Sequence, residues 1–173
     1  MARLENLLGA LALALTDRLL GAGPASPAPA SERAALVTLY AHPDRMVSWL
    51  GQVLGLTSSG VTRLVDRLAA AGWVNRAAGS DARSRRLTLS AAGREQARAV
   101  LRDRAEAMAG AVRGLSDADR AEFERLLGLV VSGLAVDTSE AFRVCRLCDR
   151  GACASGGPGC PLVSPDAGTG PDD

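Results

Sequence analysis

The sequence predicts a mostly α-helical protein with one small β-hairpin. At 173 residues, the chain suits one compact domain, with or without a tail, and it is long enough to bury a core. Apolar residues in the middle of the chain recur at the i, i+3, i+4 and i+7 positions of an amphipathic helix: Val61, Leu64, Val65 and Leu68. Two short strands are expected at residues 73–76 and 86–89, joined through a turn with the sequence Ala78-Gly79-Ser80-Asp81.

Helices are expected on both sides of a Gly- and Pro-rich linker near the N-terminus. The first runs from residue 2 to residue 20 and has leucines at helical spacing: Leu4, Leu8, Leu11, Leu15 and Leu19. Residues 21–30 break this helix. A second helix covers residues 31–41 and ends before Pro43, and a third covers residues 45–54.

The amphipathic pattern around Val61 predicts a helix from about residue 57 to residue 71. Gly55 supplies the turn before this helix, and Gly72 lies where a left-handed C-cap would end it. Its second face carries five groups that can donate hydrogen bonds to phosphates and base edges: Ser58, Ser59, Thr62, Arg63 and Arg67.

Two further helices are expected after the hairpin. Ser90 caps a long helix that reaches about residue 113, and Gly114 ends it. Ser116 and Asp119 resemble a capping box at the start of the last helix. That helix is expected to bury six apolar side chains: Phe123, Leu126, Leu127, Val130, Val131 and Leu134.

Positive charge is concentrated around the hairpin. Residues 57–86 contain six Arg and two Asp, whereas residues 114–173 contain five Arg and ten acidic residues. The net charge of the whole chain is only +1, so the protein is not a general polyanion binder. A basic segment on a nearly neutral chain is typical of a protein that contacts DNA with one face.

The stretch GVTRLVDRLAAAGWVNR, followed by DARSRRLTLSAAG, resembles the winged helix-turn-helix of the MarR family of bacterial transcriptional regulators. The resemblance implies that residues 57–71 form the helix that enters the major groove. It also implies that the wing turn places Arg83 in the minor groove, with Asp81 orienting Arg83 or capping the turn. The family's sequence after the wing is matched at four positions: Leu87, Leu89, Ser90 and Gly93.

Two positions depart from the family pattern. Ser90 stands where the family usually has Thr, and Ala82 stands where an arginine is common. Ser caps a helix as Thr does, and Arg85 and Arg86 can compensate for the lost arginine by holding phosphates. Alternation along the strand should point Arg85 and Arg86 to opposite faces.

The resemblance further implies that the winged helix-turn-helix, mostly α with a small β-wing, is joined to a helical dimerisation layer formed by the N- and C-terminal helices. The leucine-rich first helix agrees, because a monomer would expose a large apolar patch there. Two reading helices related by a two-fold axis favour a palindromic operator. The implied function is a sequence-specific, DNA-binding transcriptional regulator that acts as a homodimer on double-stranded DNA, as a repressor. A small-molecule effector is a further implied partner, and Trp49 either lines its site or packs in the core.

All four cysteines fall within one 16-residue segment, in a C-x2-C-x4-C-x6-C spacing: Cys145, Cys148, Cys153 and Cys160. Four thiols so close together in a cytoplasmic protein favour a bound metal over structural disulfides, and Zn²⁺ held by all four is the simplest occupant. An iron-sulfur cluster and redox-active thiols without a metal are the alternatives. The resemblance does not assign this segment. Because it follows the last helix, we expect it at the dimerisation layer rather than beside the DNA-reading helices, where a structural change would alter operator affinity.

The chain is accordingly divided into five segments. They are an N-terminal dimerisation helix (1–22), a winged helix-turn-helix (31–93), C-terminal dimerisation helices (94–140), a cysteine-rich metal or redox tail (141–162) and a disordered end (163–173).

Several other classes of protein are not favoured. The apolar run from Leu7 to Leu15 is preceded by Glu5 in the would-be basic region of a signal peptide and is followed by Asp17 and Arg18 before any cleavage point. The run is also too short to span a bilayer, so we expect a cytoplasmic protein without a membrane partner. The only histidine, His42, is expected at the surface or at a helix cap. No catalytic constellation is recognisable, so an enzyme is not expected. The alternative function is a metal- or redox-carrier protein with a vestigial helix-turn-helix, which would show no salt-dependent, sequence-selective binding to duplex DNA.

Overall fold

The computed structural model describes residues 2–21, 29–77, 85–155 and 159–162. The elements in these ranges follow in the order α1 (Arg3–Gly21), α2 (Ala30–Ala41), β1 (Arg45–Met46), α3 (Val47–Leu54), α4 (Ser58–Ala70), β2 (Val74–Arg76), β3 (Arg86–Leu89), α5 (Ala91–Ala111), α6 (Asp117–Ser132), α7 (Thr138–Val144) and α8 (Arg150–Ser155). The mostly α fold with a small sheet is therefore as predicted. The predicted wing turn with Asp81 and Arg83 lies outside the described residues, as does the end predicted to be disordered, 163–173.

The strands form one antiparallel sheet in the order β1-β3-β2. The sequence predicted β2 and β3 but not β1, since residues 45–54 were expected to be helical throughout. Arg45 and Met46 instead pair with Leu87 and Arg86 of β3, and α3 begins only at Val47. The prediction for residues 45 and 46 was wrong because their ladder partners lie about 40 residues away, beyond the reach of a local pattern.

The core lies where α2, α3 and α4 meet the sheet and the first part of α5. Leu36 and Leu39 of α2 are buried there, together with Leu50 of α3 and Leu87 of β3. The four residues that predicted an amphipathic α4 are all buried in this core: Val61, Leu64, Val65 and Leu68. One face of α4 therefore packs inward and the other is left for solvent.

Local signals fix both ends of α4. Gly55, with a φ of 64°, makes the left-handed turn after α3, a conformation that glycine adopts without a steric penalty. Thr57 accepts a hydrogen bond from the Gly60 amide at 3.2 Å and so caps the start of α4. Gly72, with a φ of 72°, follows its end as predicted.

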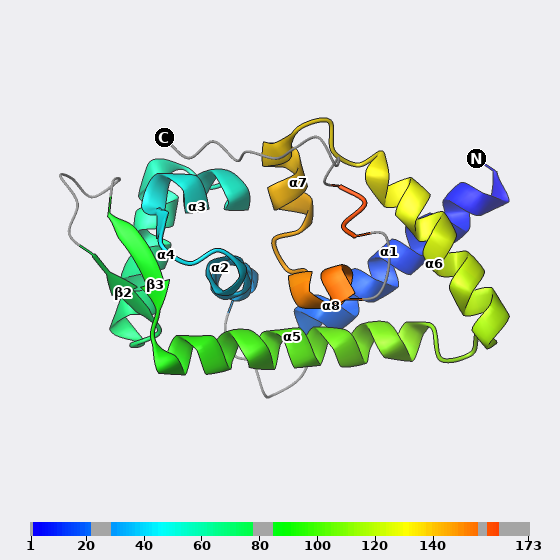
Figure 1. Cartoon of the computed structure of the whole chain (residues 1–173), viewed down its shortest axis with the longest axis horizontal. Coiled ribbons are helices and arrows are strands. Elements are labelled where there is room, and N and C mark those ends of the chain that lie inside the picture. The colour runs from blue at the N-terminus through cyan, green and yellow to red at the C-terminus, as the bar shows by residue number, and fades with distance from the viewer. Residues whose placement is uncertain (1, 22–28, 78–84, 156–158, 163–173) are drawn as a thin grey trace.

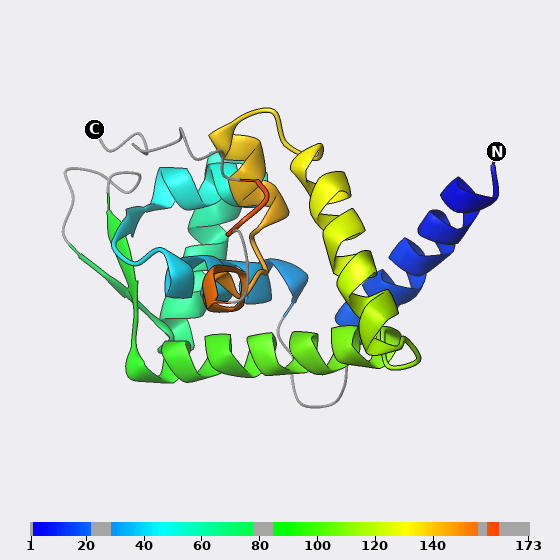
Figure 2. The ribbon, with the colours of Figure 1, turned by 45° about the vertical axis from the view of Figure 1, so that its right-hand side comes forward.

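α1 and α6 stand away from the core. α5 runs from the sheet at one end of the molecule to α6 at the other (Figure 1), and α1 and α6 extend outward from that far end (Figure 2). α6 has no buried residue, so the prediction that it buries its apolar face was wrong for a single copy of the chain. The predicted Ser116 cap is present, since its hydroxyl accepts a hydrogen bond from the Asp119 amide at 3.2 Å.

The helix expected to be the last is followed by α7 and α8, which lie beside α2 and α3 (Figures 1 and 2). Ala141 of α7 is buried, and α7 packs against α3. The cysteine-rich part of the chain was expected at the dimerisation layer. Its leading helix, α7, instead contacts the helix-turn-helix, whereas Leu147, between the first two cysteines, lines a hollow with Leu19 of α1 and Val100 of α5. The expectation was therefore wrong only for the part of the segment that lies beside the helix-turn-helix.

Candidate nucleic-acid interface

The outward face of α4 carries the polar side chains that the sequence singled out. Ser58, Ser59 and Arg63 are exposed. Thr62 is half-buried, and its hydroxyl donates a hydrogen bond to the Ser58 carbonyl at 2.8 Å. Among the described residues, none pairs with the Arg63 guanidinium. Arg63 is therefore the strongest candidate on α4 for a contact with a base edge or a phosphate.

Arg67 has a structural partner that the sequence did not reveal. Its Nε donates to Oε1 of Glu32 in α2 at 2.7 Å, and the Glu32 side chain is only 10% exposed. A buried carboxylate needs such a partner, so Arg67 links α4 to α2. The predicted DNA contact of Arg67 remains a prediction. Such a contact would be made by Nη1 or Nη2, because Nε donates to Glu32.

Two other arginines of this region are paired with carboxylates. Arg76 of β2 donates to Oδ1 of Asp66 in α4 at 2.6 Å. Arg86 donates to the carbonyl of Asp44 at 2.9 Å and lies 3.4 Å from its carboxylate. The basic charge counted from the sequence is thus partly neutralised within the fold. These ion pairs also fix the strands against α4 and against the start of β1.

Arg85 lies at the junction of α4 and the sheet. Its side chain is exposed, and its carbonyl accepts a hydrogen bond from the Val47 amide at 3.1 Å. A shallow hollow between α4 and the strands is lined by six residues: Val47, Thr62, Val65, Asp66, Arg76 and Arg85. The structure therefore brings Thr62 and Arg85 to one surface. Arg86 is directed to Asp44 instead, which agrees with the predicted divergence of the two arginines.

An aromatic cluster joins the helix-turn-helix to α7. The rings of His42, Trp49 and Phe142 meet edge to face, with centroid separations of 5.0–5.5 Å. Burial lowers the pKa of His42 to about 4, and the positive charges of Arg150 and Arg45 act in the same direction, so this histidine is neutral at pH 7. His42 is the C-cap residue of α2, as one of the two predicted roles had it. Trp49 is partly buried against the core.

Each of the four cysteines lies within electrostatic range of two others. Cys145 is the C-cap residue of α7, and the Cys148 amide donates to its carbonyl at 2.9 Å. The thiol of Cys145 forms hydrogen bonds with Cys148 and with Cys160. Burial raises the pKa of Cys153, and the negative charges of Cys148 and Cys160 as thiolates raise it further. In the described part of the chain, however, no three His, Cys, Asp or Glu side chains are arranged to hold a metal ion.

The environment of the cysteines favours a thiolate at one position. A hydrogen bond from Cys145 lowers the pKa of Cys148 to about 6, against the effect of burial, and the positive charges of Arg104, Arg146 and Arg150 lower it further. The pKa of Cys145 is raised by the same hydrogen bond and by burial. Thiolates rather than thiols are nucleophiles and metal ligands, so Cys148 is ready for either chemistry at neutral pH.

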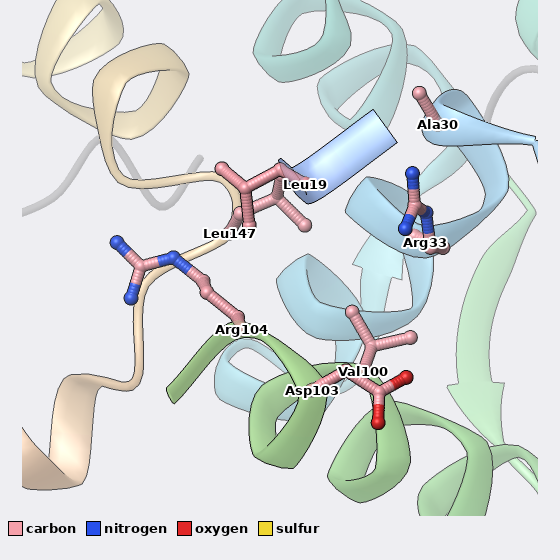
Figure 3. A pocket seen from close by; sticks show the side chains of 7 residues that line it. All are labelled: Leu19, Ala30, Arg33, Val100, Asp103, Arg104 and Leu147. Atoms are coloured by element: carbon pink, nitrogen blue, oxygen red, sulfur yellow. The ribbon is translucent and has the colours of Figure 1, made fainter. Parts of the chain in front are cut away.

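A second hollow lies between α1, α2, α5 and the chain that follows α7 (Figure 3). We call it the α1–α5 hollow; it is open to solvent. Leu19 and Leu147 lie on one side of it, and Val100 and Asp103 lie on α5 (Figure 3). Arg33 and Arg104 add two positive charges to its rim.

Comparisons with known proteins agree with this architecture. Residues 29–84 match the model of the MarR family. The fold is similar to that of a MarR family protein from Bacillus stearothermophilus, at 29% identity and a TM-score of 0.63, over 75% of this chain and 91% of that one. No curated protein matches the chain.

Two solved structures of the Mycobacterium tuberculosis MarR family protein Rv2887 are also similar. Its complex with salicylic acid matches at 26% identity and a TM-score of 0.58, over 75% of this chain and 97% of that one. Its complex with DNA matches at 22% identity and a TM-score of 0.62, over 75% of this chain and 98% of that one. The fold and the exposed face of α4 thus define a winged helix-turn-helix regulator of transcription. Over residues 29–84 the chain matches the MarR family, and over 75% of its length its fold is similar to those of MarR family proteins. Among the described residues, no helix is both long and apolar enough to cross a membrane.

Proposed function

We propose that this protein is a transcriptional repressor that binds a palindromic operator as a homodimer. The observation that carries the proposal is α4, which buries one apolar face in the core and presents Ser58, Ser59 and Arg63 to solvent. A helix held in this way can enter the major groove and read base edges with its N-terminal residues. Operator-bound protein would exclude RNA polymerase, which accounts for repression.

The terminal helices support the homodimer. Leucines and valines with more than half of their surface exposed lie on one side of α1 and on α6: Leu4, Leu7 and Leu8 on α1, and Leu129 and Val130 on α6. An apolar surface of this kind, on two helices that extend away from the core (Figure 2), marks a protein-protein interface. In a dimer with two-fold symmetry, α1 and α6 of one subunit would be covered by the same two helices of the other subunit. The two α4 helices would then lie on one side of a duplex.

Selection of duplexes from a random pool by the purified full-length protein tests the function. We expect an enriched inverted repeat, bound by two subunits, with an affinity that falls steeply as the salt concentration rises. Absence of any sequence-selective binding would overturn the proposal and favour a carrier protein with a vestigial helix-turn-helix.

A charge placed in the apolar face of α1 is expected to separate the subunits. Leu8→Glu would bury a carboxylate in the interface, so the variant should sediment as a monomer and bind the inverted repeat at least 10-fold more weakly, because burial of an unpaired charge costs several kcal/mol. Asn6→Glu is the matched control, since Asn6 is exposed on the opposite face of the same helix. A dimeric Leu8→Glu protein would place the interface elsewhere.

The α1–α5 hollow is proposed as the effector site. Its apolar walls, and the one net positive charge left by two arginines and Asp103, suit a small molecule with an apolar body and one negative charge. An effector there would contact the helices of both layers, and its binding would shift their relative position. With salicylate as the probe, Arg33→Ala is expected to weaken binding about 10-fold in calorimetry, the usual worth of a charge-assisted hydrogen bond. Arg113→Ala, which removes an exposed arginine outside the hollow, should bind salicylate as the wild type does. If both variants lost the same amount of affinity for salicylate, the α1–α5 hollow would not be the effector site.

A further inference from the structure

The cysteine segment, residues 145–160, is connected directly to the helix-turn-helix by α7. Phe142 contacts both His42 and Trp49 with its ring. Arg143 lies over the turn between α3 and α4, where a β-carbon on Gly55 would be 3.1 Å from Nη2 of its guanidinium. Cys145 follows this pair of contacts after one residue and ends the helix that makes them. A change in the conformation of the cysteines therefore acts on the turn that positions α4.

Two further contacts attach the same segment to α2. The Thr38 hydroxyl donates to the carbonyl of Arg146 at 3.2 Å. Arg150, at the start of α8, bonds with Nε2 of His42. The chain between Cys145 and Cys153 is thus held against α2 at two points, one before and one after Cys148.

The donor set and its surroundings suit a divalent metal bound by thiolates. Zn²⁺ takes four thiolates in a tetrahedron, and the resulting group has a net charge of −2. Three arginines, Arg104, Arg146 and Arg150, are close enough to Cys148 to act on it electrostatically, and they would offset that charge. The spacing of the cysteines is wider than that of ferredoxin motifs, which favours a single ion over an iron-sulfur cluster.

We propose that Cys145, Cys148, Cys153 and Cys160 bind one Zn²⁺ ion per subunit as thiolates, and that the bound ion braces α7 against α3 so that α4 is held in its DNA-binding position. Binding draws the four sulfurs from their hydrogen-bonded arrangement into a tetrahedron and releases the protons of the thiols that are protonated beforehand. The regulatory part of this inference rests on the proposed DNA-binding function. The metal site itself does not.

Metal binding is tested on the full-length protein, purified without oxygen and stripped of metal. Addition of Zn²⁺ should give one tightly held ion per subunit, and Co²⁺ as a spectroscopic probe should give thiolate-to-metal charge-transfer absorption. Cys160→Ser should lose most of the affinity for Zn²⁺. Iron with sulfide in the protein as isolated, disulfide bonds that form in place of metal binding, or unchanged zinc affinity in Cys160→Ser would each overturn the metal site.

Coupling to the helix-turn-helix is tested by the emission of Trp49 in a Trp73→Phe background and by DNA affinity. Zn²⁺ should change the Trp49 emission, because Trp49 packs against Phe142, and should raise the affinity for the selected duplex by about 10-fold or more, within the usual range of coupling between sites. Phe142→Ala should bind one Zn²⁺ but lose the dependence of DNA affinity on zinc. Ser139→Ala, an exposed position on the same helix, should keep that dependence.

These experiments distinguish failure of the proposed zinc brace from failure of the proposed DNA-binding function. One ion per subunit with no change in Trp49 emission and no change in DNA affinity would overturn the brace. A protein that binds no duplex with or without zinc would refute the proposed function, while zinc stoichiometry and Trp49 emission would still decide whether the ion braces α7.

Discussion

Replacement of Gly93 by alanine is expected to lower the free energy of unfolding by about 3 kcal/mol, at the upper end of the usual cost of overpacking. A β-carbon at Gly93 would lie 2.0 Å from the carbonyl oxygen of Trp73. That oxygen belongs to the backbone and accepts a hydrogen bond from the Ser90 amide at 2.9 Å, so it cannot move away without breaking the junction of β2, β3 and α5. Urea denaturation followed by circular dichroism measures the loss.

Gly110→Ala is the matched control for this substitution. Gly110 lies in the same helix, and a β-carbon there would meet nothing within 4 Å. Alanine is favoured over glycine in a helix by roughly 0.5–1 kcal/mol, so the control should be neutral or slightly stabilised. Equal stability of the two variants would show that α5 does not approach Trp73 as closely as the structure has it.

Substitution of Arg63 by alanine is expected to reduce the affinity for the operator by about 10- to 100-fold, which corresponds to the roughly 1–3 kcal/mol of a bidentate contact with guanine. Arg63 is exposed on the face of α4 opposite the core, and no described residue pairs with it. Fluorescence anisotropy with the selected duplex and with single-base variants of it gives the affinity and the discrimination between bases.

The salt dependence of binding separates the two roles open to Arg63. If it reads a base, Arg63→Ala should lose discrimination at one base pair of each half-site. If it only holds a phosphate, the variant should weaken binding to all sequences alike and reduce the salt slope by about 1. Arg102→Ala on α5 removes another exposed arginine, one that is paired with Glu95, and should bind as the wild type does. An unchanged affinity in Arg63→Ala would remove this residue from the interface.

The parts of the fold that follow from local patterns were predictable from the sequence. Val61, Leu64, Val65 and Leu68 predicted the buried face of α4, and Ser90 predicted the start of α5, whose Gly93 amide it caps at 3.0 Å. The capping signals succeeded because each involves residues within one turn of helix.

The parts that depend on distant partners were not predictable. Arg67 appeared as a free cation on α4, but its partner Glu32 is 35 residues earlier in the chain. The contact of the cysteine segment with the helix-turn-helix was missed for the same reason, since the contact between Phe142 and Trp49 leaves no local signature. The arrangement of side chains as DNA or metal ligands likewise depends on packing between distant elements.

The small sheet joins the wing strands to both helices of the helix-turn-helix. β1 leads directly into α3 and pairs with β3, the Val47 amide bonds to the carbonyl of Arg85, and Arg76 bonds to Asp66 of α4. α4 and the strands at the base of the wing therefore form one rigid unit. The distance between the proposed DNA contacts of α4 and those of the wing is fixed within this unit. When an operator departs from the preferred shape, the adjustment must come from bending of the duplex or from a change in the distance between subunits. Sequences that bend easily between the half-sites should thus be bound in preference to stiff ones, even at base pairs that no side chain reaches.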